Sequence, residues 1–192
     1  MLYPDPPDRV RFVRAGLDEA AGRLAELIRQ ENADLLLSYD PRGGNGHRDH
    51  VKVHQVGARA AELTGVCALE ATIPRELVAA FLRPLRVFRL VFRYDPQLIG
   101  TAGTPRSAIT HRVSVRQFAS HKRAALAAHN SQVTGKGRSA RMFRVLTALP
   151  TPIFGLLLGR EWFAEPGATA TAISDDVLRA APRGMCQGTP GS

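Results

Sequence analysis

Cysteine and aromatic residues are scarce in this chain of 192 residues, and each scarcity argues against a class of protein. Two cysteines, Cys67 and Cys186, exclude a disulfide-rich scaffold and favour a reducing compartment, so we expect a cytoplasmic protein. Aromatic residues make up 6% of the chain and do not alternate with basic ones, which argues against a stacking platform for nucleic acid. No apolar run is long enough to span a bilayer.

Charge is unbalanced, because 26 basic residues face 17 acidic ones and only three of the basic residues are lysines. A net charge of +9 could attract polyanions or an anionic membrane. The arginine bias could instead reflect a GC-rich genome, and we favour this second explanation. Between Arg75 and Tyr94, arginines recur every three or four residues. We interpret them as a solvated helix face rather than a membrane-binding one.

Segments with apolar residues at helical spacing alternate with short apolar runs bounded by loops. This order of helix, strand, helix and strand predicts a doubly wound α/β fold. We expect helices at 10–30 and 49–63 and buried strands at 34–39 and 66–69, the second helix ending before Gly65. Beyond a helix from Arg75, broken near Pro84, a strand at 110–115 and helices at 116–132 and 138–149 should follow. Residues 1–165 should form one domain, and residues 166–192 a loose tail.

The segment from Gly43 to His54 is where we look for chemistry. It holds three of the six histidines, and it follows directly on a predicted strand. Glycine permits sharp turns, and His50 and His54 fall four residues apart, on one face of the expected helix. Ligands bind at such strand ends in open α/β sheets, and imidazole is a common metal ligand. A solvated turn with no ligand is the alternative interpretation.

Three motifs in order resemble the PIG-L / LmbE-like family of zinc-dependent N-deacetylases. The first joins Tyr39-Asp40 to Gly46-His47-Arg48-Asp49-His50 and His54, with arginine where the family motif has proline. The second is the segment 122–132, which reads Lys-Arg-Ala-Ala-Leu-Ala-Ala-His-Asn-Ser-Gln. The third is Gly-Arg-Glu-Trp-Phe at 159–163, and Tyr3-Pro4-Asp5 also suits the family.

The resemblance implies a Rossmann-like, doubly wound and mostly parallel sheet, and hydrolysis of an N-acetyl group on an N-acetylglucosamine-type conjugate. His50 would bind Zn²⁺, while His47 would stabilise the oxyanion and protonate the leaving amine. Asp49 would orient His47. The resemblance also implies that His129 and His54 line or support the site, and that Asn45 stands at a substrate-facing position.

One family motif is missing, the Ala-His-Pro-Asp-Asp segment that supplies two zinc ligands and the general base. We therefore expect an N-terminally truncated domain with an incomplete zinc site and impaired activity. The alternative is an inactive remnant that binds a sugar or a protein. Strand edges left exposed could also lead to a homo-oligomer. We expect a small N-acetylated sugar conjugate as the ligand, and neither nucleic acid nor a membrane span.

Overall fold

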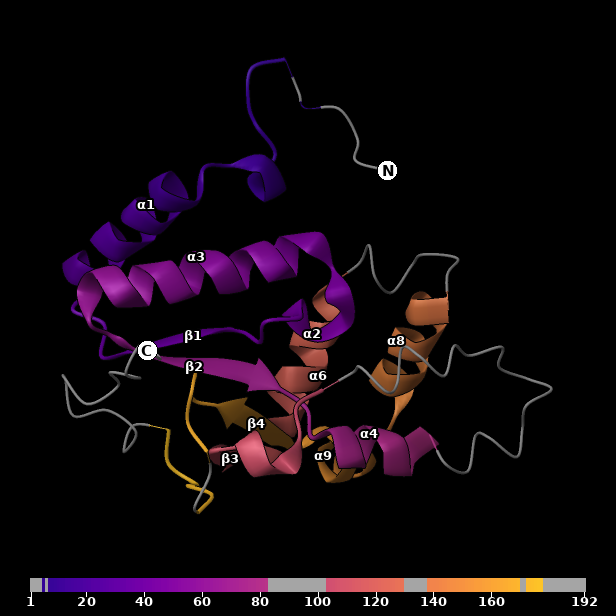
Figure 1. Cartoon of the computed structure of the whole chain (residues 1–192). Helices are drawn as coiled ribbons and strands as arrows, with labels where there is room; N and C mark the ends of the chain where they lie inside the picture. Colours follow the sequence, from indigo (N-terminus) through magenta and orange to yellow (C-terminus); the bar gives the residue numbers. More distant parts are fainter. Residues whose placement is uncertain (1–4, 6, 83–102, 130–137, 170–171, 178–192) are drawn as a thin grey trace. The chain divides into compact units, whose positions relative to one another are not determined.

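The computed structural model describes the chain except for residues 1–4, 6, 83–102, 130–137, 170–171 and 178–192 (Figure 1). The chain divides into two compact units. Unit 1 comprises residues 1–111 and 162–192, and unit 2 comprises residues 112–161.

Unit 1 is built on a parallel strand–helix–strand segment. It consists of β1 (Leu35–Tyr39), α3 (Arg48–Thr64) and β2 (Cys67–Thr72), preceded by α1 (Leu17–Gln30). In Figure 1, α3 lies between α1 and the two strands. The core between α1 and α3 contains mostly small side chains, which lets the two helices pack closely. Its buried residues are Ala21, Ala25, Ile28, Val56 and Ala60. α3 ends at Gly65, which adopts a left-handed conformation with φ 70° and donates its N–H to Ala61 O.

Four strands form the described sheet, in the order β1-β2-β4-β3, with β3 spanning His111–Ser114 and β4 spanning Arg160–Ala164. β1 and β2 are parallel, with Ser38 opposite Glu70, whereas β2 and β4 are antiparallel. Hydrogen bonds from Thr110 N to Phe163 O and from Val115 N to Gly159 O show that β3 and β4 are antiparallel too. The α/β class is confirmed, but only one pair of the described sheet is parallel. The reason is that the segment after β3 returns as β4 in the neighbouring position.

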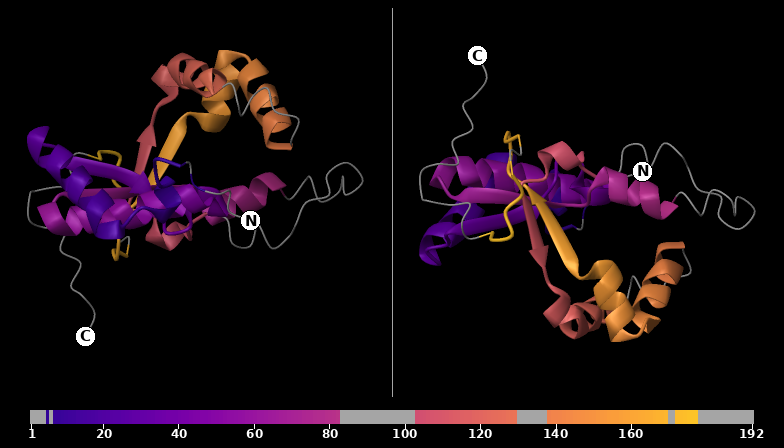
Figure 2. Two further views of the ribbon diagram at one scale, coloured as in Figure 1. Left: turned by 90° about the horizontal axis from the view of Figure 1, so that it is seen from above. Right: turned by 90° about the horizontal axis from the view of Figure 1, so that it is seen from below.

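Unit 2 is mainly helical, as Figure 2 shows, although it also includes parts of β3 and β4. Few side chains are buried among its described elements. A 3₁₀ turn, Arg116–Phe118, leads into α6 (Ala119–Ala128), followed by α8 (Arg138–Ala148) and α9 (Thr151–Leu158). Ala119, Ala140 and Phe154 are buried. A Cβ on Gly155 would lie 3.1 Å from Ala119 Cβ, so a glycine allows α9 to approach α6 closely.

Most predicted elements are present, and the differences have local causes. The first helix begins at Leu17 rather than near Val10, after a 3₁₀ turn at Phe12–Arg14. The helix predicted from Arg75 is α4 (Arg75–Leu82), and the rest of that prediction lies outside the described residues. No local pattern predicted α9 or β4, because the apolar run of α9 carries no helical period and β4 follows it directly.

Two findings bear on the expected setting of the protein. None of the helices that the structure describes combines the length and the apolarity needed to cross a bilayer. Cys67 is buried in β2 and is disulfide-bonded, so it gives no support to the expectation of a reducing compartment. Of the predicted tail, Ser174 donates its N–H to Thr110 O.

Candidate active site at the start of α3

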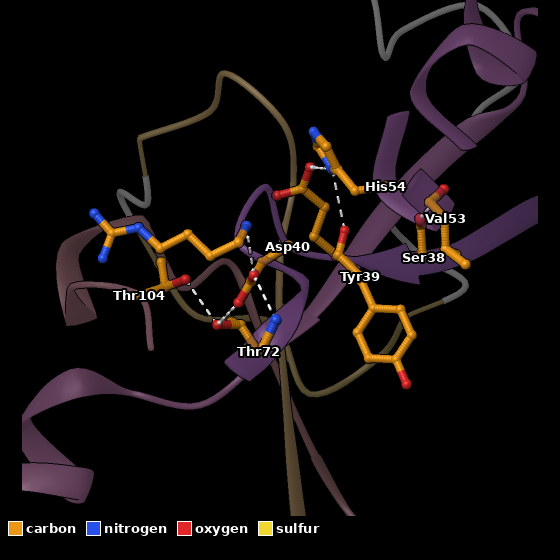
Figure 3. A network of polar contacts seen from close by, with 10 residues as sticks. Ser38, Tyr39, Asp40, Val53, His54, Thr72 and Thr104 are labelled. Carbon is orange, nitrogen blue, oxygen red and sulfur yellow. Dashed lines mark hydrogen bonds and ion pairs between the residues drawn. The ribbon is translucent and has the colours of Figure 1, made fainter. Parts of the chain in front are cut away.

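The turn between β1 and α3 is held by the buried carboxylate of Asp40 (Figure 3). Its Oδ1 accepts the backbone N–H groups of Arg42 and Gly44, both at 3.0 Å, and its Oδ2 accepts the Thr72 hydroxyl at 3.1 Å. The chain then passes through α2 (Gly43–Gly46), where Gly43 has φ 61°. A Cβ on Gly43 would lie 2.5 Å from His50 Cβ, so only glycine fits there.

His47 is the N-cap of α3, and its ring accepts a hydrogen bond from the chain that follows. Nδ1 accepts the backbone N–H of Asp49 at 3.3 Å, which places the proton of the neutral ring on Nε2. Asp49 Oδ2 lies 3.8 Å from the same Nδ1 and would form an ion pair with a protonated ring. In the neutral form, Asp49 therefore contacts His47 through its backbone, while its carboxylate lies further away.

His50 has the opposite tautomer and lies beside His47. Its Nδ1 is 3.1 Å from Gly43 O, and since a carbonyl only accepts, the proton is on Nδ1. The lone pair is therefore on Nε2, as a metal ligand requires. The ring stacks on Tyr39 at a centroid distance of 4.3 Å with planes 5° apart, and the His47 ring is 4.9 Å away.

His54, one turn further along α3, faces β2 instead. Its Nδ1 lies 3.1 Å from both Tyr39 O and Glu70 Oε1, so it donates one shared N–H to two acceptors (Figure 3). Glu70 is 7% exposed in the middle of β2. Burial raises the pKa of its carboxyl, the nearby Asp40 charge adds to the rise, and His54 opposes it.

For His129 and Asn45, the described contacts show no link to the histidines of α3. His129 follows α6 in unit 2, and its Nδ1 lies 2.8 Å from Ala125 O in the preceding turn. Asn45 lies in α2, and its side chain falls outside the described part of the chain.

A zinc ion needs more ligands than the described residues offer. Within the described ranges, no three His, Cys, Asp or Glu side chains converge as a metal site. His50 fits a ligand role through its tautomer, whereas His54 Nδ1 is taken up by Glu70 and Tyr39. The described residues thus provide one of the three protein ligands that a catalytic zinc ion normally has.

A cavity of about 260 Å³ opens beside this site within unit 1, at the ends of β1 and β2. Charged side chains of both signs line it, among them Asp40, Glu70, Arg75 and Glu165. Arg75 Nε is buried and has no hydrogen-bond partner among the described residues.

Sequence reasoning missed Glu70, Thr72 and the ring of Tyr39. A signal for Glu70 was present, since a carboxylate inside the apolar strand Cys-Ala-Leu-Glu-Ala-Thr is costly to bury and therefore informative. The stacking of Tyr39 on His50 carried no such signal, because the backbone of the turn brings the two rings together.

Comparison with known proteins gives relatives named "1D-myo-inositol 2-acetamido-2-deoxy-alpha-D-glucopyranoside deacetylase", in some cases with a number after the name. The protein of that name from Streptomyces avermitilis is 34% identical over 160 residues, which cover 74% of this chain and 53% of that protein. The one from Saccharomonospora viridis is 36% identical over 128 residues, covering 64% and 47% of the two chains. A third, from Catenulispora acidiphila, is 50% identical over 52 residues, covering 27% and 16%.

The chain is therefore a homologue of proteins named as deacetylases. It spans about half the length of the curated relatives it matches. No model of a protein family matches it.

Proposed function

We propose that the protein is a metal-dependent hydrolase that removes the N-acetyl group from an N-acetylglucosamine-type glycoconjugate. One observation carries the proposal: two histidine rings, 4.9 Å apart at the start of α3, hold opposite tautomers. One ring presents a lone pair and the other an N–H. The relatives support it, since they are named for deacetylating an acetamido sugar joined to inositol.

His50 would hold Zn²⁺ through Nε2, with further ligands supplied from beyond the described residues. Zinc in such a site polarises the amide carbonyl and lowers the pKa of water. The hydrogen bond from Nδ1 to Gly43 O and the stack on Tyr39 fix the imidazole plane, so Nε2 keeps one direction.

His47 would act on the oxygen and nitrogen of the amide. The Nε2–H of the neutral ring can donate to the oxyanion as the carbonyl carbon becomes tetrahedral. A protonated ring can give its proton to the departing amine nitrogen, and the Asp49 carboxylate, 3.8 Å from Nδ1, would stabilise that cation. The products are acetate and a free amino sugar.

The remaining residues would support this site. We propose that His54 acts from behind it, and that His129 and Asn45 contribute from the second motif and from α2. We also propose that the parallel β1–α3–β2 unit is part of a Rossmann-like sheet in the whole protein, because such units are what doubly wound sheets repeat.

A binding module is the second candidate, and the small number of candidate zinc ligands among the described residues favours it. The described residues offer one credible zinc ligand, yet the cavity beside Glu70 is formed. Such a protein would bind an acetamido sugar without cleaving it. β1, the edge strand of the described sheet with Leu37 55% exposed, could then pair two copies.

Acetate release decides between the two candidates. The protein is incubated with an N-acetylglucosaminyl-inositol conjugate, with added Zn²⁺ or with a chelator, and acetate and free amine are measured together. A hydrolase releases both in equal amounts and stops in the chelator. Sugar binding without release would overturn the proposal and support the binding module.

A further inference from the structure

The buried carboxylate of Glu70 lies behind the candidate site and has no role in the proposed hydrolysis. Glu70 is opposite Ser38 in the parallel pair of strands, so both side chains are on one face of the sheet. α3 covers that face closely, since Ser38 Oγ donates to Val53 O at 3.5 Å and a Cβ on Gly57 would lie 2.7 Å from Ser38 Oγ. This approach brings His54 to the Glu70 carboxylate.

From Glu70, contacts lead step by step to His50. Glu70 Oε1 accepts the His54 Nδ1–H at 3.1 Å, and Tyr39 O shares that proton at 3.1 Å. Tyr39 is the last residue of β1, and its ring lies flat on His50. The carboxylate therefore orients His54, and His54 fixes the end of β1, as the contacts of His54 in Figure 3 show. The end of β1 in turn sets the Tyr39 ring on which His50 stacks.

We propose that Glu70 is a positioning residue, which acts through His54 and Tyr39 to hold the imidazole of His50 in one orientation. The role given to His50 rests on the proposed function, whereas the geometric linkage does not. Glu70 itself touches neither His50 nor His47 in the contacts of the described residues.

Energetics favour a positioning role over a purely structural one. A carboxylate that is 7% exposed loses its hydration, and a pair of well-packed apolar residues is often at least as stable as a buried ion pair. His54 offsets part of this cost by lowering the pKa of the Glu70 carboxyl, whereas Asp40 is also negative and raises it, and burial keeps that pKa above its usual range. Stability alone does not call for a carboxylate at this position, so its presence points to a role in orientation.

The test compares Glu70→Leu, Glu70→Gln and the double variant Glu70→Leu/His54→Leu in the whole protein. Long-range ¹H–¹⁵N spectra report the imidazole tautomers, and the stacked Tyr39 ring shifts the His50 carbon-bound protons upfield. We expect Glu70→Gln to keep the Nδ1–H tautomer of His54 and the shift of His50, because an amide oxygen still accepts. Glu70→Leu and the double variant should lose the shift of His50.

Stability measurements separate positioning from folding. The double variant should unfold at the same or a higher urea concentration than the parent, yet lose the His50 shift and about tenfold in deacetylation rate. An unchanged His50 shift in Glu70→Leu would overturn the positioning proposal. Loss of the shift in a protein that never releases acetate would overturn the proposed function alone.

Discussion

The two units differ most in what they bury. Every buried polar or charged residue of the described chain belongs to unit 1, namely Asp40, Glu70, Thr72, Thr110 and His111. The described residues of unit 2 bury only small or apolar groups, and they expose large apolar ones, with Met142 55% and Leu156 67% exposed. Burying polar groups costs free energy unless they are paired, so a unit that buries several is organised for more than stability. The buried polar residues therefore support placing the proposed chemistry in unit 1.

The largest difference should appear between a histidine variant in unit 1 and a control histidine variant in unit 2. His50→Ala should abolish zinc-dependent acetate release, since it removes the only ligand that the described residues provide. The control, His121→Ala, changes an exposed ring in α6 and should leave the rate unchanged. Zinc content by mass spectrometry and acetate release are measured on the same samples. Equal rates in the two variants would remove the distinction between the units.

Packing gives the next contrast. Leu69→Ala in β2 should lower the free energy of unfolding by about 2–5 kcal/mol, because Leu69 is fully buried and the cavity would persist. Met142→Ala in α8 should change it by less than about 0.5 kcal/mol, because that side chain is largely exposed. Urea unfolding measures both. A large loss in Met142→Ala would show that the exposed face of unit 2 is covered in solution.

Within the turn before α3, two glycines should respond differently to alanine. Gly43→Ala should cost more than about 2 kcal/mol, because its φ is 61° and the new Cβ would collide with His50. Gly46→Ala should cost about 1 kcal/mol, because its φ is 78° but nothing lies within 4 Å. Unfolding and the upfield shift of His50 are measured together. Equal costs would mean that the turn does not press on His50.

The smallest effects are slopes of stability with pH, which arise from the buried groups of unit 1. Burial raises the folded-state pKa of the Glu70 carboxyl above 4.5, so the folded state binds that proton more tightly than the unfolded one. Relative to Glu70→Gln, the parent should be most stable below pH 4.5 and lose that advantage as pH rises through the folded pKa. Unfolding in urea at several pH values measures the difference. Parallel curves would contradict the raised pKa.

His111 should show the opposite slope. Burial lowers the pKa of its ring below 6.5, so the unfolded state binds the proton more tightly. The parent should lose stability relative to His111→Gln as pH falls below 6.5 and through the lowered pKa. A difference that grew with rising pH would show that the ring is charged in the folded state.

The sequence predicted unit 1 better than unit 2, for physical reasons. Helical periods located α1 and α3, and short apolar runs bounded by loops located β1 and β2. In contrast, α9 is apolar all round and β4 follows it directly, so no period separates them. The antiparallel return of β4 depends on contacts between distant segments, which local patterns do not encode.

The candidate site was predictable where chemistry is concentrated in one segment. His47 and His50 were found from the Gly-rich turn and the family motif, and the structure brings their rings to 4.9 Å. Glu70 lies 20 positions after His50, and its link to the site runs through a backbone carbonyl. Only the strand register and the close approach of α3 show that link.

The central claim is that His47 and His50 divide the work of amide hydrolysis, and His47→Ala tests it most directly. With zinc content and acetate release followed in one sample, the account expects the metal to be retained and kcat to fall by about 10²-fold, because the proton donor is lost while the ligand stays. Acetate release at the parental rate would contradict the account.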